Sequence, residues 1–239
     1  MKLTVVGCSP AWPNPGGAQS GYLVDGSAPL LLDCGPGVLA RLRELHDGWP
    51  RVDAVVITHF HLDHWGDLVP WFFGAAFGPG RGAARPQLWL PPRGGQTLRE
   101  HGERLSFTDR IDAAFEVREY REHEAFAASG FDIVPVRLQH YRQPTFGLRV
   151  DDGRSILAYS GDTGPSPALE DLARGADLFL CEATLRNPER GERGHLTAEE
   201  AIHAFQASGA RRLVVVHRPA ELPLDPTFER ARDGDVLVF

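Results

Sequence analysis

The chain has few cysteines, and they show no pairing pattern. Its 239 residues include three, Cys8, Cys34 and Cys181, which are odd in number and widely spaced. None belongs to a C-x-x-C pair, so the sequence offers neither a disulfide framework nor a thiolate metal site. Free cysteines suit a reducing compartment, and we therefore expect a cytoplasmic protein.

Long apolar runs, internal repeats, linkers and an excess of basic residues are also missing. No segment approaches the roughly 20 apolar residues of a membrane-spanning helix, so we expect no membrane association. Acidic residues outnumber basic ones by 32 to 25, which gives a net charge of −7. That balance disfavours a long nucleic acid held by its phosphates. With no boundary signal, residues 1–239 are expected to form one domain.

Strand and helix patterns are interspersed along the chain. Apolar and β-branched runs predict strands at 2–6, 22–24, 30–33, 52–57, 87–90, 131–139, 145–150, 155–159, 177–181, 212–216 and 235–239. Helices are predicted at 38–45, 66–77, 166–175 and 197–209, and the polar segment 96–128 is expected to be mostly helical. We predict an α+β protein, an αββα sandwich in which two mixed β-sheets pack face to face with helices on both outer faces.

Two of the predicted helices carry large apolar side chains. The first places four of them on one face, namely Val38, Leu39, Leu42 and Leu45. The second is rich in aromatic residues, which are Trp65, Trp71, Phe72, Phe73 and Phe77. Core packing accounts for these aromatic residues better than a wall on which a substrate stacks.

Four potential metal ligands fall within six residues, in the stretch Thr58-His59-Phe60-His61-Leu62-Asp63-His64. The apolar run before this stretch predicts a buried strand, so the stretch is the loop that leaves it. In an extended backbone, His59 and His61 point the same way, and Asp63 and His64 follow where the chain must turn. Three imidazoles and a carboxylate exceed what one ion uses. We therefore predict a site for two metal ions.

Three further polar residues follow predicted strands. They are His140, Asp162 and His217, and each comes directly after a buried run. Functional groups gather at such a rim because the strands fix their positions while the loops leave room for a substrate. Four other histidines each lie in a polar or helical context without companions and are expected to be structural or on the surface; they are His46, His101, His123 and His203.

The order of these motifs, from residue 3 to residue 239, resembles the metallo-β-lactamase superfamily. The shared features are T-H-x-H-x-D-H, a later His, a Gly-Asp after a strand and a last His after an apolar strand. The resemblance implies a first ion held by His59, His61 and His140. It implies a second ion held by Asp63, His64 and His217. Asp162 would bridge the two.

The same resemblance assigns a supporting role to Asp33, which matches an early family Asp near the metal loop. Its carboxylate would accept a hydrogen bond from a ligand imidazole and so fix the tautomer of the ring. Imidazole and carboxylate ligands suit Zn²⁺, our first expectation, and also Mn²⁺ or Fe²⁺. Two ions roughly 3.5–4 Å apart can share a bridging hydroxide and neutralise both oxygens of an in-line displacement. We count Asp63 among the catalytic residues as well as among the ligands.

Two later motifs resemble those of the ribonuclease Z-like phosphodiesterases. Cys181-Glu182-Ala183-Thr184 matches an E-A-T motif, and Gly194-His195-Leu196-Thr197 matches H-S-T with Leu196 in place of a small hydroxyl residue. In those enzymes the His, oriented by the Glu, protonates the leaving alkoxide, which implies the same roles for His195 and Glu182. The alternative is that Thr197 is only a helix N-cap and His195 a loop residue.

The short segment between His140 and Asp162 narrows the class of substrate that the resemblance implies. Ribonuclease Z carries an arm for transfer RNA between the positions that match His140 and Asp162, and here residues 141–161 leave no room for one. The phrases S-G-Y-L, F-G-L-R, A-Y-S-G-D-T-G and C-E-A-T are similar to those of compact bacterial members that resemble cyclic-nucleotide phosphodiesterases. We expect hydrolysis of a small phosphodiester, with a cyclic nucleotide first.

Several alternatives stay open. The first is an endonuclease acting at RNA 3′ ends, and the second is a lactonase or β-lactamase-like hydrolase, which needs no leaving-group acid. The third is a binding protein that keeps metals for structure. Family members often pair near the site, which implies a homodimer.

Two departures from the family pattern fall beside predicted ligands. Tyr141 follows His140 where close relatives have proline. Arg218 follows His217 in place of an apolar residue, and we expect it either to assist phosphate binding or to face solvent.

Overall fold

The computed structural model describes residues 1–239 and contains fourteen strands. The first group of strands comprises β1 (Lys2–Gly7), β2 (Gly21–Asp25), β3 (Leu30–Leu32), β4 (Ala54–Val56), β5 (Gln87–Leu90), β6 (Glu116–Glu119) and β14 (Val236–Val238). The second comprises β7 (Phe126–Ala128), β8 (Phe131–His140), β9 (Gln143–Asp151), β10 (Ile156–Tyr159), β11 (Leu178–Glu182), β12 (Leu213–Val216) and β13 (Glu229–Arg230).

Each group forms one seven-stranded mixed sheet. Sheet one has the order β14-β1-β2-β3-β4-β5-β6, and sheet two has the order β13-β12-β11-β10-β9-β8-β7. In each sheet some neighbours are antiparallel, as in the β8–β9 hairpin, and others are parallel, as in β10–β11. The first and last strands lie side by side, with Lys2 opposite Val238, so both ends of the chain belong to sheet one.

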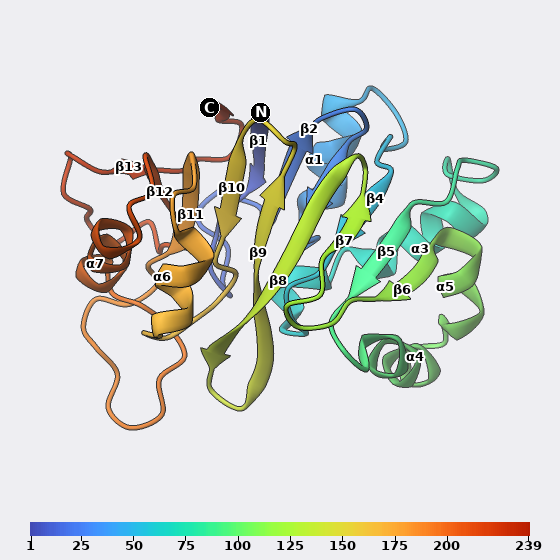
Figure 1. The fold of residues 1–239 in the computed structure, drawn as a ribbon. Coiled ribbons are helices and arrows are strands. Elements are labelled where there is room, and N and C mark those ends of the chain that lie inside the picture. Colours follow the sequence, from blue (N-terminus) through green and yellow to red (C-terminus); the bar gives the residue numbers. More distant parts are fainter.

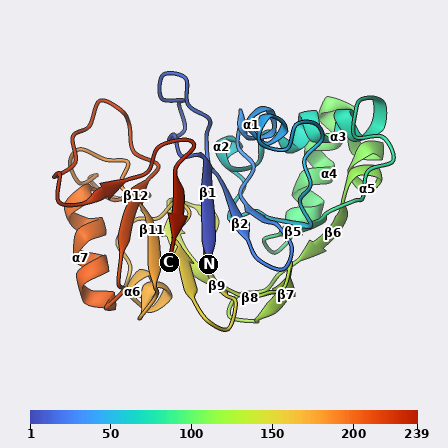
Figure 2. The same cartoon turned by 90° about the horizontal axis from the view of Figure 1, so that it is seen from above.

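Seven helices complete the structure, and the longer ones cover the outer faces of the sheets. They are α1 (Val38–Leu45), α2 (Leu62–Trp65), α3 (Leu68–Phe77), α4 (Gly94–Leu105), α5 (Thr108–Ala114), α6 (Pro167–Ala173) and α7 (Ala198–Ser208). Helices α1, α3, α4 and α5 lie outside sheet one, and α6 and α7 lie outside sheet two (Figures 1 and 2). The structure confirms the predicted αββα sandwich.

Three apolar clusters correspond to these layers. The largest contains 24 buried residues and lies between the sheets, where Val5 and Tyr22 of sheet one meet Phe146 and Leu180 of sheet two. A second joins sheet one to its helices, and a third joins sheet two to α6 and α7. Because both faces of each sheet are covered, most central strands read as continuous apolar runs, which is why the sequence revealed them.

Side-chain caps and a glycine mark the ends of the helices α6 and α7. Ser166 caps α6 by accepting a hydrogen bond from the backbone of Ala168, with Pro167 in the first turn. Thr197 and Glu200 form a reciprocal capping box at the start of α7. Gly209 ends that helix at a φ of 69°, a left-handed conformation that favours glycine.

The structure corrects several local expectations. Segment 96–128 is helical only as far as the end of α5 at Ala114, and it then forms the strands β6 and β7. Leu45 is 53% exposed rather than part of the buried face of α1. Trp65, Trp71 and Phe72 are buried as predicted, but Phe73 and Phe77 are exposed on the outer side of α3. No helix is long and apolar enough to cross a membrane.

Candidate metal centre

The His-rich stretch leaves β4 and turns at once into α2. His59 and His61 lie in the extended part, with ring centroids 4.9 Å apart, while Asp63 and His64 lie in the single turn of α2. This turn, which the sequence did not reveal, rests on the segment after β3, where Cys34 N donates to His64 O over 2.7 Å. A Cβ on Gly35 would approach Asp63 O to 2.0 Å, so the close approach requires glycine.

The fold brings all seven predicted ligands together in two overlapping groups. The first contains His59, His61, His140 and Asp162, and the second contains Asp63, His64, Asp162 and His217. In each group the potential ligand atoms lie within 4.8 Å of one another. Asp162 belongs to both, since its Oδ2 lies 3.8 Å from His59 Nε2 and its Oδ1 lies 3.5 Å from His217 Nε2. Asp162 thus lies between the two groups.

Asp33 lies behind the second group and has no exposed surface. His64 Nδ1 donates to Asp33 Oδ2 over 2.7 Å, and Tyr159 OH donates to the same oxygen over 2.7 Å. Thr58 donates to Asp33 through its backbone N and its hydroxyl. The Nδ1 proton of His64 is thereby fixed on the Asp33 side, and the Nε2 atom is directed toward the ligand cluster.

The other imidazoles are oriented in the same way by oxygen atoms. His140 Nδ1 donates to Gly194 O over 2.6 Å, and His217 Nδ1 donates to Thr184 Oγ1 over 2.8 Å. His59 Nδ1 lies 3.1 Å from Thr58 Oγ1, whose proton goes to Asp33. Each contact turns the Nε2 atom of its ring toward the cluster, where His140 Nε2 lies 2.7 Å from His61 Nδ1 and His217 Nε2 lies 3.0 Å from Asp63 Oδ2.

The pKa values of the titratable groups in the cluster are shifted in different directions. Burial lowers the pKa of His59, His61 and His140, so these imidazoles stay neutral. Burial would raise the pKa of Asp63, but His64 and His217 outweigh it and bring that pKa down to about 2. The pKa of Asp162 is likewise held well below its usual range, against burial, by His217 and His64. Burial would lower the pKa of His64, but the charges of Asp162, Asp33 and Asp63 outweigh it and raise that pKa well above its usual value, so a cation binding there would displace a proton.

Three buried atoms at the centre lack hydrogen-bond partners, namely His59 Nε2, His64 Nε2 and Asp162 Oδ1. His64 Nε2 approaches Asp162 Oδ1 to 3.2 Å without hydrogen-bond geometry. Buried polar groups are normally satisfied, and leaving them unpaired is costly. Bound cations would satisfy all three, so the donor set fits the predicted pair of divalent ions.

A histidine–carboxylate pair adjoins the ligands. Glu182 ends β11 with no exposed surface, and its Oε1 accepts from His195 Nδ1 over 2.7 Å. His195 Nδ1 also lies 4.0 Å from Asp162 Oδ2. Burial alone would lower the pKa of His195, but the charge and hydrogen bond of Glu182 overcome it and raise this pKa to about 9. His195 is therefore protonated near neutral pH in this environment.

A cavity of about 400 Å³ opens onto the cluster. It is lined by Ala11, Gln19, His61, Leu62, Asp63, Asp162 and His195. Two of these residues come from the long Gly/Pro-rich loop between β1 and β2, where Gln19 Nε2 donates to the carbonyls of Pro10 and Ala11. This long loop thus forms one wall of the site.

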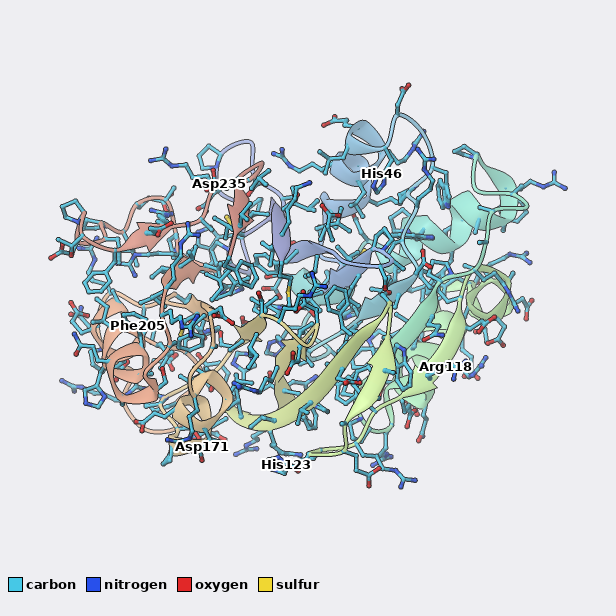
Figure 3. The ribbon with its side chains drawn as sticks, turned by 45° about the horizontal axis from the view of Figure 1, so that its top comes forward. His46, Arg118, His123, Asp171, Phe205 and Asp235 are labelled. Carbon is cyan, nitrogen blue, oxygen red and sulfur yellow. The ribbon has the colours of Figure 1, made fainter.

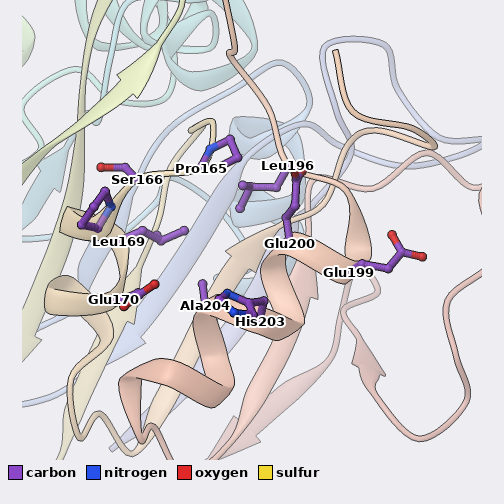
Figure 4. A pocket seen from close by; sticks show the side chains of 10 residues that line it. Pro165, Ser166, Leu169, Glu170, Leu196, Glu199, Glu200, His203 and Ala204 are labelled. Atoms are coloured by element: carbon purple, nitrogen blue, oxygen red, sulfur yellow. The ribbon is translucent and has the colours of Figure 1, made fainter. Parts of the chain in front are cut away.

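A second cavity lies between α6 and α7, and none of the predicted ligands lines it. It has a volume of about 440 Å³, and its lining includes Leu169 of α6 and His203 and Ala204 of α7 (Figure 4). Leu196, the residue after His195, closes one end and is buried. His203 therefore lies away from the metal ligands, and His46 and His123 lie at the periphery (Figure 3).

Arg218 has a role that the sequence did not suggest. The side chain is 5% exposed, and its guanidinium donates to the carbonyl oxygens of Ala183 and Pro223. The side chain therefore does not face solvent, and both of its terminal nitrogens donate to backbone carbonyls. Arg218 instead ties the segment after His217 to the strand end that carries Glu182.

Sequence reasoning gave no role to Thr58, Thr184 or Tyr159, whose hydroxyls orient ligands or Asp33. Thr184 also donates to Glu182 Oε2 over 2.7 Å and so links the metal ligand His217 to the acid pair. Each of the three lies within three residues of a predicted site residue. Their closeness in sequence to predicted site residues was the signal that could have identified them.

Comparison with known proteins agrees with the fold. The model of the beta-lactamase superfamily domain matches residues 29–218, so the chain belongs to that superfamily. With its two His/Asp clusters, it is a metallo-hydrolase of the metallo-β-lactamase fold. Its relatives include a probable metallo-hydrolase and ribonuclease Z enzymes.

Three relatives show the degree of similarity. An uncharacterized protein of Mycobacterium tuberculosis is 34% identical over 99% of this chain and 88% of its own length. Ribonuclease Z of Myxococcus xanthus is 27% identical over 95% of this chain and 90% of its own. The probable metallo-hydrolase YhfI of Bacillus subtilis is 28% identical over 92% and 87%. The crystal structure of YhfI superposes with a TM-score of 0.83 at 24% identity, covering 99% of both chains.

Proposed function

We propose that this metallo-hydrolase is a dinuclear phosphodiesterase that cleaves a small phosphodiester, with a cyclic nucleotide as the leading candidate. The observation that carries the proposal is the Glu182–His195 pair beside the ligand cluster. Hydrolysis of a phosphodiester of an alcohol expels an alkoxide, which is a poor leaving group unless it is protonated. The resemblance assigns a histidine acid of this type to the ribonuclease Z-like phosphodiesterases and not to lactonases or β-lactamase-like hydrolases.

The residues would hold two ions, Zn²⁺ first, with Mn²⁺ or Fe²⁺ also suited to the ligands. His59, His61 and His140 face one position, Asp63, His64 and His217 face the other, and Asp162 reaches both. When bound, such ions lower the pKa of a coordinated water and offset negative charge on a phosphoryl group.

His195 is suited to deliver the proton. Its Nδ1 proton is engaged by Glu182, so the proton on Nε2 is the one available to a leaving oxygen. Glu182 fixes the ring because its carboxylate is itself held by the backbone N–H groups of Thr163 and Thr184. A pKa of about 9 keeps the ring charged near neutral pH, and nearby cations would lower that value toward the operating range.

The surroundings of the site favour a small substrate. The β8–β9 hairpin closes with His140 opposite Gln143, so Tyr141 and Arg142 alone occupy the place of a longer insertion. The cavity of about 400 Å³ has the size of a site for one small molecule. The net charge of −7 also disfavours a long nucleic acid. Ribonuclease Z-like cleavage of RNA is the second candidate, favoured by the relative from M. xanthus.

The test uses two substrates that differ in their leaving groups. Purified protein with Zn²⁺ or Mn²⁺ should hydrolyse bis(p-nitrophenyl) phosphate and a 3′,5′-cyclic nucleotide, and chelation should abolish both activities. His195→Ala should reduce cyclic-nucleotide hydrolysis by about 100-fold or more but affect the nitrophenyl ester far less, because nitrophenolate leaves without a proton. His203→Ala, an exposed histidine of α7, is the matched control.

Two results would count against this assignment. Equal losses on both substrates would remove His195 from the acid role. Hydrolysis of lactones or RNA precursors without hydrolysis of small phosphodiesters would replace the proposed substrate class with an alternative.

A further inference from the structure

Tyr141 occupies a strained position at the tip of the β8–β9 hairpin. It has a φ of 48°, in the left-handed region that bulky side chains rarely adopt. The two-residue turn between His140 and Gln143 imposes this conformation. The side chain is 39% exposed, so burial in the core does not explain why a tyrosine occupies this strained position. Strain of this kind persists where the surrounding structure holds it, often at functional sites.

The ring of Tyr141 faces the proposed acid. Its centroid lies 5.7 Å from the ring of His195 and 5.1 Å from the ring of the ligand His140. The contact with the neighbouring backbone is close, because a Cβ on Gly194 would lie 2.2 Å from the tyrosine ring. Glycine just before His195 therefore lets the aromatic ring pack directly on the chain that carries the acid.

The hydroxyl of Tyr141 extends this contact to the loop after β11, which is the long orange loop at the lower edge of Figure 1. It donates a hydrogen bond to Glu189 Oε1. The other carboxylate oxygen of Glu189 accepts from Gly194 N over 2.9 Å. Glu189 thus joins the hairpin tip to the peptide that immediately precedes His195.

Further bonds fasten the same short segment to the hairpin. Tyr141 N donates to Arg193 O over 3.3 Å, and His140 Nδ1 donates to Gly194 O over 2.6 Å. Gly194 is therefore held through both its N–H and its carbonyl. The ring of His195 makes one hydrogen bond, to Glu182, and packs against the rings of His140 and His217. The contacts of Arg193 and Gly194 restrain the backbone that leads into it.

We propose that Tyr141 and Glu189 are positioning residues that hold His195 over the metal centre. This inference rests on the proposed function, in which His195 donates a proton to the leaving oxygen. A general acid is effective only when its donor atom stays within hydrogen-bonding distance of the leaving oxygen. The hydroxyl–carboxylate pair also couples the ligand His140 to the acid, because one hairpin tip supports both.

The kinetic test compares Tyr141→Phe, Glu189→Ala and Glu189→Gln with wild type. Loss of the hydrogen bond should lower kcat on a cyclic nucleotide by about 3- to 10-fold in Tyr141→Phe and Glu189→Ala. The KM and the rate on bis(p-nitrophenyl) phosphate should stay near wild type. Glu189→Gln should recover part of the loss, because its amide oxygen can still accept from Gly194 N.

Glu192→Gln supplies the matched control. Glu192 lies on the same loop, is half exposed and approaches only the exposed Arg142, at 3.7 Å. This variant should behave as wild type. Equal losses on both substrates in Tyr141→Phe, or a loss in Glu192→Gln as large as in Glu189→Gln, would overturn the positioning role.

A second measurement does not depend on phosphodiesterase activity. Hydrogen–deuterium exchange of the peptide spanning residues 190–196 should be faster in Tyr141→Phe and Glu189→Ala than in wild type and Glu192→Gln. Unchanged exchange would refute the proposal that Tyr141 and Glu189 hold this segment, even if the enzyme is a phosphodiesterase. Faster exchange in a protein without that activity would instead leave the contact standing and remove the proposed function.

Discussion

Replacing Asp33 with asparagine would measure how far metal binding depends on one buried carboxylate outside the ligand set. Asp33 adopts a φ of 59°, and asparagine is one of the few side chains that tolerate this region, so the backbone should be preserved. The shape of the side chain is also kept. What changes is the negative charge and one of the two acceptor atoms.

The expected effect follows from the four groups that donate to Asp33. They are the backbone N and hydroxyl of Thr58, the Nδ1 of His64 and the hydroxyl of Tyr159. An asparagine NH₂ placed toward His64 would donate to Nδ1, which moves the imidazole proton to Nε2, the atom that should face a cation. We expect affinity for the second ion to fall about 10- to 100-fold.

The fold should weaken by a smaller amount. A buried donor left without its acceptor costs about 1–3 kcal/mol, and the amide introduced by Asp33→Asn can satisfy some but not all of the four donors. We therefore expect a decrease of that order in the free energy of unfolding of the metal-free protein. Chemical denaturation in the presence of a chelator measures it.

Competition between the protein and a chromophoric zinc chelator would measure the two affinities, and Asp47→Asn is the matched control. Asp47 also has a positive φ, 46°, but is exposed beyond the end of α1. That control should bind two ions as wild type does. If Asp33→Asn kept both affinities, the tautomer argument would be wrong; if it lost both ions equally, Asp33 would support the whole loop rather than His64.

Two further predictions concern the acid and the metal loop. Because a general acid must be protonated, kcat on a cyclic nucleotide should fall as pH rises through the pKa of His195, which is about 9 without cations and lower with them. Glu182→Gln removes the charge that raises this pKa, so the falling limb should move to lower pH by about one unit or more; an unmoved limb would assign it to another group. Gly35→Ala would press a Cβ against Asp63 O, 2.0 Å away, and should destabilise the fold by about 1–3 kcal/mol and weaken zinc binding, measured by thermal unfolding and zinc titration. Wild-type behaviour would show that α2 can shift without cost.

Much of the fold was predictable because the informative patterns are local. Central strands such as β11 and β12 are buried on both faces and read as apolar runs. The ends of α6 and α7 follow from caps within a few residues. The edge strand β6 was missed because its residues are exposed or only partly buried, so no apolar run marks it. The short helix α2 has too few residues for a periodic pattern.

The sequence by itself determined which ligand types this protein offers and in what order, because His59, His61, Asp63 and His64 fall within one short stretch and the later ligands each follow a strand. Only the tertiary structure decided how they are oriented. Asp33 and His64 are 31 residues apart, and Asp63 and His217 are 154 apart, so their contacts depend on sheet order and register. The contact of Tyr141 and Glu189 beside His195 likewise depends on a hairpin turn and a loop meeting in space, which no local pattern encodes.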